Sequence, residues 1–193
     1  MSQKFLCRAS LCQVLLLIDQ DLAAKTRAGG CGCGGNLHKA DYDRKPRGGP
    51  EGLGPEHKKR FSFCCELDGC RKRATPPSVR FLGRRVYLGA VIVLVAVLVE
   101  GATRKRIAKL RALVDDVSER TIERWRKWWR EHFPTTEFWR EHGARFSPAV
   151  ASVRLPTSLV ERFARGGGYV RLVMMLRFLS PLTTAWRPPT GKK

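Results

Sequence analysis

The chain has 193 residues, with 37 Lys or Arg against 17 Asp or Glu, and a formal net charge of +20 at pH 7. This length excludes a large two-lobed enzyme, and a hydrophobic fraction of 43% excludes a fully disordered chain. So basic a protein is expected to bind a polyanion, either nucleic acid or an anionic membrane surface. Charge alone does not choose between the two.

The first apolar stretch is short. Val14–Ile18 is apolar, but Asp19 and Asp21 close the run after five residues. The apolar region of a secretory signal peptide needs about 7–15 residues. We therefore expect an amphipathic helix over Cys12–Arg27 in place of a signal peptide.

A second apolar stretch, Val86–Val99, has no charged residue and follows Arg84 and Arg85. A membrane-spanning helix needs about 20 such residues. The run therefore predicts a helix buried in a small helical core, with a buried strand and a membrane anchor as the alternatives. On the first interpretation the protein is cytoplasmic and has no membrane partner.

The chain has seven cysteines, an odd number that argues against a disulfide framework. Cys7 and Cys12 are typical of small core residues. The other five form two clusters, within GCGCGG at 30–35 and FCCELDGC at 63–70. Two short cysteine loops of this kind are typical of a structural zinc ribbon. The predicted zinc ligands are Cys31, Cys33, Cys65 and Cys70.

Two alternative ligands remain open. Cys64 can replace Cys65, and His38 can replace one of the cysteines, since imidazole also binds zinc. The rival interpretation is a set of free thiols in a glycine-rich loop. We expect the stretch between the clusters, Asp41–Glu56, to be a mobile loop, and Phe61–Phe63 to be a short strand leading into the second cluster.

A helix-turn-helix pattern follows the apolar run. Apolar residues repeat on one helical face between Arg104 and Val114, and two aspartates then break the pattern. Ser118 is a suitable N-cap for a second helix that extends to about Phe133. The predicted buried stripe of this second helix is Ile122, Trp125 and Trp129.

The opposite face of the second helix is basic. It carries Arg120, Arg124 and Lys127, with Ser118 and Thr121 at its N-terminal end. A recognition helix has this arrangement: its apolar side packs against a partner helix, and its basic side faces the major groove. These five residues are the predicted DNA contacts of the helix. The alternative is a surface helix with a solvated charged face.

A basic bridge joins the second cysteine cluster to the apolar run. Its predicted phosphate contacts are Arg71, Lys72, Arg73, Arg84 and Arg85. No acid lies between residues 71 and 85, and two prolines oppose helix formation. Such a segment suits a DNA backbone, where each neutralised phosphate releases counterions. The alternative is a soluble linker.

The C-terminal third predicts two helices, Pro156–Arg165 and Tyr169–Leu179, and a disordered tail over Arg187–Lys193. We find no catalytic residues: the acids beyond Phe133 are three glutamates, and no phosphate-binding loop or nucleophile motif is present. The sequence therefore predicts neither an enzyme nor a small-molecule substrate.

The order of these motifs resembles the N-terminal half of transposases from bacterial insertion sequences, which begin with a zinc ribbon and a helix-turn-helix. It is also similar to small uncharacterised bacterial proteins of that build. The similarity covers about Ala28–Phe133 and includes the stretch SERTIERWRKWW. The resemblance implies DNA binding for a mobile element. The family adds a catalytic core of three acids that bind Mg²⁺. This chain departs there, since Glu137, Glu141 and Glu161 are its acids beyond Phe133.

We therefore expect a mainly α protein, with a small β zinc-ribbon-like module, a helix-turn-helix domain and a C-terminal helical hairpin. The predicted boundaries are 1–28 for an N-terminal helix, 29–80 for the ribbon and bridge, 81–134 for the helix-turn-helix, 135–186 for the C-terminal helices and 187–193 for the tail. The predicted function is sequence-specific binding of double-stranded DNA without catalysis, with a transposase or a second copy as further partners. The alternatives are a transcription regulator of the same architecture, a truncated transposase and a membrane-associated protein.

Overall fold

The structure, a computed structural model, describes residues 9–44, 47–50, 52–82, 87–99, 117–163 and 169–185. It is mainly helical, with a small amount of sheet. The helices are α1 (Ala9–Ala28), α2 (Gly89–Val99), α4 (Glu119–Lys127), α5 (Glu137–His142), α6 (Thr157–Arg162), α7 (Tyr169–Leu179) and α8 (Leu182–Ala185). The strands are β1 (Leu37–Lys39), β2 (Tyr42–Asp43), β3 (Lys59–Arg60), β4 (Phe63–Cys65) and β5 (Arg73–Ala74).

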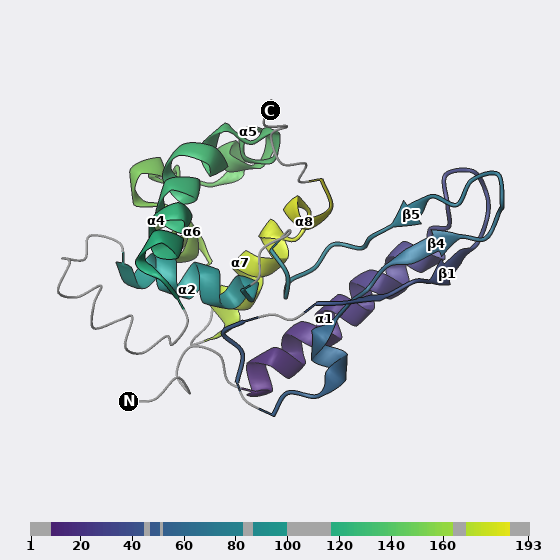
Figure 1. Cartoon of the computed structure of the whole chain (residues 1–193). Coiled ribbons are helices and arrows are strands. Elements are labelled where there is room, and N and C mark those ends of the chain that lie inside the picture. The colour runs from purple at the N-terminus through teal and green to yellow at the C-terminus, as the bar shows by residue number, and fades with distance from the viewer. Residues whose placement is uncertain are drawn as a thin grey trace, which may run out of the picture.

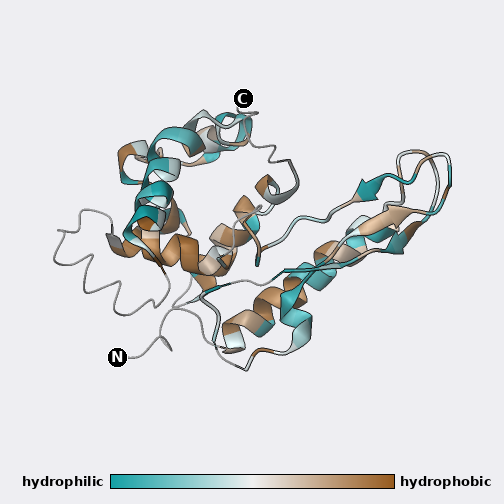
Figure 2. Ribbon diagram, in the orientation of Figure 1, coloured by the Kyte–Doolittle hydropathy of each residue, from teal (hydrophilic) through white to brown (hydrophobic). Residues whose placement is uncertain are grey.

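The elements form two parts. The helical body consists of the described residues from 87 onward. The arm, which contains the strands and the C-terminal half of α1, projects away from the body (Figure 1). Apolar residues gather on α2, on α7 and on the N-terminal half of α1, where these helices meet (Figure 2). A second, smaller core lies inside the arm.

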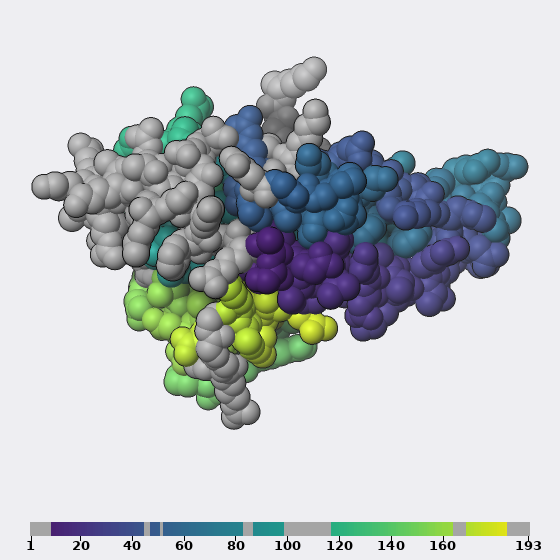
Figure 3. Space-filling view, turned by 90° about the horizontal axis from the view of Figure 1, so that it is seen from below, coloured from purple at the N-terminus to yellow at the C-terminus, as the bar shows by residue number. Residues whose placement is uncertain are grey.

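Helix α1 belongs to both cores. Leu11 and Leu15, in its first half, are buried in the core of the helical body, whereas Ala23, in its second half, is buried against the arm. At 1.5 Å per residue, this helix of 20 residues is about 30 Å long. Figure 3 shows α1 lying along the residues of the arm. The helix therefore connects the two parts through both of their cores. It is longer than the predicted Cys12–Arg27 at both ends.

A buried ion pair ties α1 to the chain that leaves the arm. Arg80 Nε donates to Asp19 Oδ2 at 2.8 Å, and both side chains are at least 98% buried. Asp19 also accepts from the Ser78 hydroxyl at 2.6 Å and from the Val79 amide at 2.7 Å. The remaining Arg80 nitrogens donate to main-chain carbonyls of residues 56, 57 and 59. Every charged atom of the pair thus has a partner, as a buried pair requires.

Helix α2 is the centre of the body. Its residues Ala90, Val91, Ile92 and Val93 are fully buried, which confirms the predicted buried helix. Within the described part of the chain, no helix combines the length and the apolar character that a membrane crossing needs. The apolar character of α2 on all sides follows from its enclosure by α1, α4 and α7.

Helix α4 begins where the sequence predicts. The Ser118 hydroxyl caps it by accepting from the Thr121 amide at 3.2 Å. The buried stripe of Ile122, Trp125 and Trp129 is confirmed, with exposed fractions of 3% or less. The predicted preceding helix, Arg104–Val114, lies outside the described residues, as do Cys7 and the predicted disordered tail.

The helix changes its winding after Lys127, and Trp128–His132 forms a π-helical turn. This turn buries Trp128 as well as Trp129, and Trp128 packs against the rings of Trp129 and Phe133. In a regular α-helix, Trp128 would lie off the stripe formed by Ile122, Trp125 and Trp129. The wider turn explains how adjacent tryptophans both reach the core.

The arm contains a three-stranded antiparallel sheet in the order β1-β4-β5 and a two-stranded sheet of β2 and β3. In the second sheet Tyr42 pairs with Arg60, and Asp43 with Lys59. The predicted mobile loop over 41–56 is therefore wrong at its start, because pairing with a strand beyond the loop fixes Tyr42 and Asp43. The strand predicted at Phe61–Phe63 begins two residues later, as β4.

The C-terminal helices agree with the sequence in part. Helix α7 has the predicted bounds, and α6 is shorter than the predicted Pro156–Arg165. The two helices contact each other, as expected of a hairpin. Helix α5, which the hydrophobic pattern did not reveal, follows an N-cap at Thr136 that accepts from the Trp139 amide at 3.1 Å.

Candidate metal centre and the basic surface of α4

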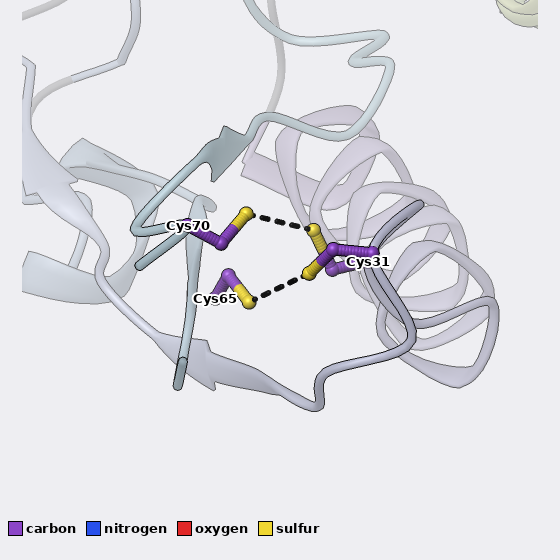
Figure 4. Close-up of side chains that lie close together, drawn as sticks. Cys31, Cys65 and Cys70 are labelled. Carbon is purple, nitrogen blue, oxygen red and sulfur yellow. Dashed lines mark hydrogen bonds between the residues drawn. The ribbon is translucent and has the colours of Figure 1, made fainter. Parts of the chain in front are cut away.

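Four cysteine sulfurs meet at the end of the arm. The Sγ atoms of Cys31, Cys33, Cys65 and Cys70 all lie within 4.8 Å of one another. Cys31 and Cys70 are 3.7 Å apart, and Cys33 and Cys65 are 3.4 Å apart. Figure 4 shows Cys65 and Cys70 directed at the loop that carries Cys31. Four sulfurs around a zinc ion, at about 2.3 Å from it, are about 3.8 Å from each other. The four cysteines are therefore close enough to hold one metal ion.

The first cysteine loop follows directly from α1. Cys31 donates its amide to Gly35 at 2.9 Å, and Gly34 donates to Cys31 at 2.8 Å, so the loop closes on itself. Gly34 has a φ of +87°, in the left-handed region that favours glycine. A Cβ on Gly35 would lie 2.8 Å from the Cys65 sulfur. Glycine at this position thus lets the two loops approach, even though the cysteine spacing is one residue shorter than the usual pattern.

The second loop is built by the sheet. Cys65 pairs with Leu37 in β1, and its amide donates to the Lys72 carbonyl at 2.9 Å. The chain turns at Leu67, whose carbonyl accepts from the amides of Cys70 and Arg71 at 2.9 and 3.0 Å. The strand pairing and this turn place Cys65 and Cys70 on the side of the first loop.

The structure distinguishes between the alternative ligands. Adjacent residues of a strand point to opposite faces, so Cys64 turns away from the cluster and donates to the Arg71 carbonyl at 3.4 Å. His38 is paired with Cys64 in the sheet, is two-thirds exposed, and contacts the Glu66 carboxylate at 3.0 Å. Cys65 is thus the residue of its pair that joins the cluster, and His38 lies apart from it.

The four thiols influence one another's ionisation. The pKa of Cys33 is lowered to about 6 by a backbone hydrogen bond with Gly35 and by hydrogen bonds with the neighbouring thiols. A backbone hydrogen bond with Leu67 favours the thiolate of Cys65, but burial and the neighbouring sulfurs outweigh it and raise its pKa to about 12. Four thiolates this close need a cation to balance their charge, so metal binding would release protons.

The basic side of α4 faces solvent. Arg120, Arg124 and Lys127 are exposed, and their spacing of four and three residues aligns them along one flank of the helix. Lys127 lies 3.7 Å from Glu131 in an exposed ion pair, the kind that contributes little stability. Ser118 is exposed at the N-terminal end of the same helix.

Thr121, which the sequence predicts to contact a base, is nearly buried. It is only 7% exposed, and its hydroxyl lies 3.0 Å from the Ser118 hydroxyl and accepts from Arg124 at 3.1 Å. Its position is the reason: Thr121 lies on the side of α4 that carries Ile122 and Trp125, at the edge of the buried stripe. A side chain held there exposes little surface to a ligand.

The basic bridge has several different surroundings. Arg71 pairs with Asp68, Lys72 is exposed, and Arg73 lies over the Tyr42 ring, with its guanidinium carbon 5.8 Å from the ring centroid. Arg80 lies within the same basic bridge of the sequence, but it is 98% buried and paired with Asp19. Arg84 and Arg85 lie outside the described residues.

Outside the cysteine cluster, the described residues contain no group of three or more cysteine, histidine or acidic side chains placed to hold a metal. Of the three C-terminal glutamates, Glu161 pairs with Arg154 at 2.9 Å and Glu141 lies 3.8 Å from His142.

Comparisons with protein-family models, with curated proteins and with solved structures find no match to this chain.

Proposed function

We propose that this protein binds double-stranded DNA in a sequence-specific manner, without catalysis, and that zinc holds its arm together. The observation that carries the proposal is the surface of α4. Arg120, Arg124 and Lys127 are exposed along one flank, while the opposite side of the same helix is packed in the core. A helix about 10–12 Å across fits a major groove about 12 Å wide.

The ligand chemistry supports zinc as the metal. Four thiolates suit zinc, whereas magnesium and calcium prefer oxygen ligands. With all four tetrahedral positions filled by protein, the ion would have no free position for a substrate, which is the arrangement of structural sites. The zinc would therefore stabilise the arm and take no part in a reaction.

We further propose that the DNA belongs to a transposable element and that the protein acts in the cytoplasm, with a transposase or a second copy of itself as partner. The support for this role is the resemblance of the motif order to the DNA-binding half of transposases. Titration against element ends and against the DNA upstream of its own gene separates this role from that of a transcription regulator.

Removal of the α4 charges tests DNA binding. The triple variant Arg120→Gln, Arg124→Gln, Lys127→Gln is expected to bind a labelled duplex about 100-fold more weakly, because it loses three cationic contacts. Since each phosphate contact contributes about 0.9 to the slope of log affinity against log salt, the slope is expected to fall as well. Fluorescence anisotropy at several salt concentrations measures both quantities.

The matched control removes the same charge elsewhere on the helical body. Arg140, Arg145 and Arg177 are exposed on α5, on the turn after it and on α7. Their simultaneous replacement by Gln is expected to leave most of the affinity intact. Equal losses in the two triple variants would show that net charge, and not the surface of α4, drives binding.

A further inference from the structure

A chain of hydrogen bonds runs along the first two turns of α4. The Ser118 hydroxyl accepts from the Thr121 amide at 3.2 Å and lies 3.0 Å from the Thr121 hydroxyl. Arg124 Nη2 donates to that same Thr121 hydroxyl at 3.1 Å. The three residues are spaced three apart, so each is the neighbour of the last, about one turn further along the helix.

This chain joins a buried group to an exposed one. Thr121 is 7% exposed and fixed by the packing of the helix, whereas Arg124 is exposed. The hydrogen bond therefore holds a long, mobile side chain to a rigid part of the fold. A guanidinium has five N–H donors. One of them is used here, and among the described residues the guanidinium has no other hydrogen bond or ion pair, so the rest of the fork can contact a ligand.

Lys127, on the same flank, is held differently. The amine of Lys127 lies 3.7 Å from the Glu131 carboxylate, and both side chains are about 60% exposed. Such a pair restrains a side chain weakly. A fixed planar fork suits the paired acceptors of a base, while a flexible cation suits the diffuse charge of a phosphate.

We infer that Arg124 reads a guanine in the major groove and that Thr121 is the positioning residue that holds its guanidinium in the reading orientation. This inference rests on the proposed function. Guanine presents two acceptors, O6 and N7, which arginine contacts with both arms of its fork. Thr121 thus contributes to specificity by holding Arg124 in place, without itself contacting DNA.

Substitution of the Thr121 hydroxyl tests this role. Thr121→Val removes the hydroxyl at nearly the same shape and leaves the cap between the Ser118 hydroxyl and the backbone amide in place. Thr121→Ser keeps the hydroxyl. Affinities are measured for the preferred duplex, obtained by selection from random sequence, and for duplexes with single base-pair replacements.

In Thr121→Val we expect discrimination at one G·C position to fall about tenfold, with an unchanged salt slope, because no phosphate contact is lost. Thr121→Ser is expected to retain the discrimination. Arg124→Lys keeps the charge but not the fork, and is expected to lose discrimination at that same position. If Thr121→Val does not fold, Arg124→Lys still tests the guanine contact on which the inference depends, and unchanged discrimination in Arg124→Lys would overturn it.

Full discrimination in Thr121→Val, or an equal loss of affinity on every duplex, would overturn the positioning role. A wild-type protein that binds DNA but prefers no duplex would overturn the inference together with the sequence specificity of the proposed function. A wild-type protein that binds no duplex would overturn DNA binding itself. The failure of the positioning role and that of the proposed function are thus distinguishable.

Discussion

Removal of the metal is expected to unfold the arm while the helical body stays folded. The core of the arm consists of four buried apolar residues: Ala23, Leu37, Phe63 and Cys65. So small a core does not offset the entropy of ordering its loops. Metal binding in comparable zinc modules contributes about 10–16 kcal/mol of apparent folding free energy. The helical body has a much larger core of its own.

Two signals separate these outcomes. After treatment with a strong chelator, amide exchange should become fast in β1 and β4. The tryptophans 125, 128, 129 and 139 all lie in the helical body, so near-ultraviolet circular dichroism should keep most of its intensity. If the near-ultraviolet circular dichroism were lost at the same chelator concentration at which amide exchange in β1 and β4 becomes fast, the metal would support the whole fold.

The cysteines offer a matched pair of variants for the same prediction. Cys65→Ser removes a sulfur from the cluster, whereas Cys64→Ser removes its neighbour on the opposite face of the strand. We expect one zinc per chain in Cys64→Ser and a large loss of zinc in Cys65→Ser. Equal zinc content in the two variants would contradict the ligand assignment.

Asp19→Asn is expected to destabilise the protein by about 3–5 kcal/mol, the cost of leaving a buried charge without its partner. Arg80 is 98% buried and has Asp19 as its counter-ion, and its hydrogen bonds to main-chain carbonyls go to neutral groups. The asparagine keeps the shape of the side chain but not its charge. Urea unfolding monitored by circular dichroism measures the change in the free energy of unfolding.

Asp21→Asn is the control, two residues further along the same helix. Asp21 is half exposed and forms an ion pair with Lys25, one turn away. Such pairs contribute about 0.3–0.5 kcal/mol. A similar change in stability for the two variants would mean that the Asp19–Arg80 pair does not hold α1 to the rest of the fold.

The parts of the fold that local patterns govern could be predicted from the sequence. The Ser118 cap, the buried stripe of α4 and the buried α2 all follow from short-range periodicity and side-chain chemistry. The four cysteines of the cluster were also predicted, because ligand type and glycine content are visible in the sequence. The choice of Cys65 over Cys64 required the strand register, which decides the face on which each sulfur lies.

Long-range pairing explains what the sequence did not reveal. In the sequence, Arg80 is one more cation of the basic bridge. Its partner Asp19 is 61 residues away, so no local pattern indicates the pairing. The sequence predicts Thr121 as a base contact. In the structure, α4 is oriented so that Trp125 and Trp129 are both buried, and this orientation leaves Thr121 nearly buried as well. In each case the position of a polar group was set by packing that no local pattern records.

A nuclear magnetic resonance titration of isotope-labelled protein with its preferred duplex tests the central claim most directly, because it locates the contacting surface residue by residue. We expect the largest shifts at the backbone of Ser118–Lys127 and at the Arg124 side chain, with small shifts in α7. Shifts confined to α7 or to the arm, with α4 unchanged, would contradict the assignment of α4 as the DNA-reading helix.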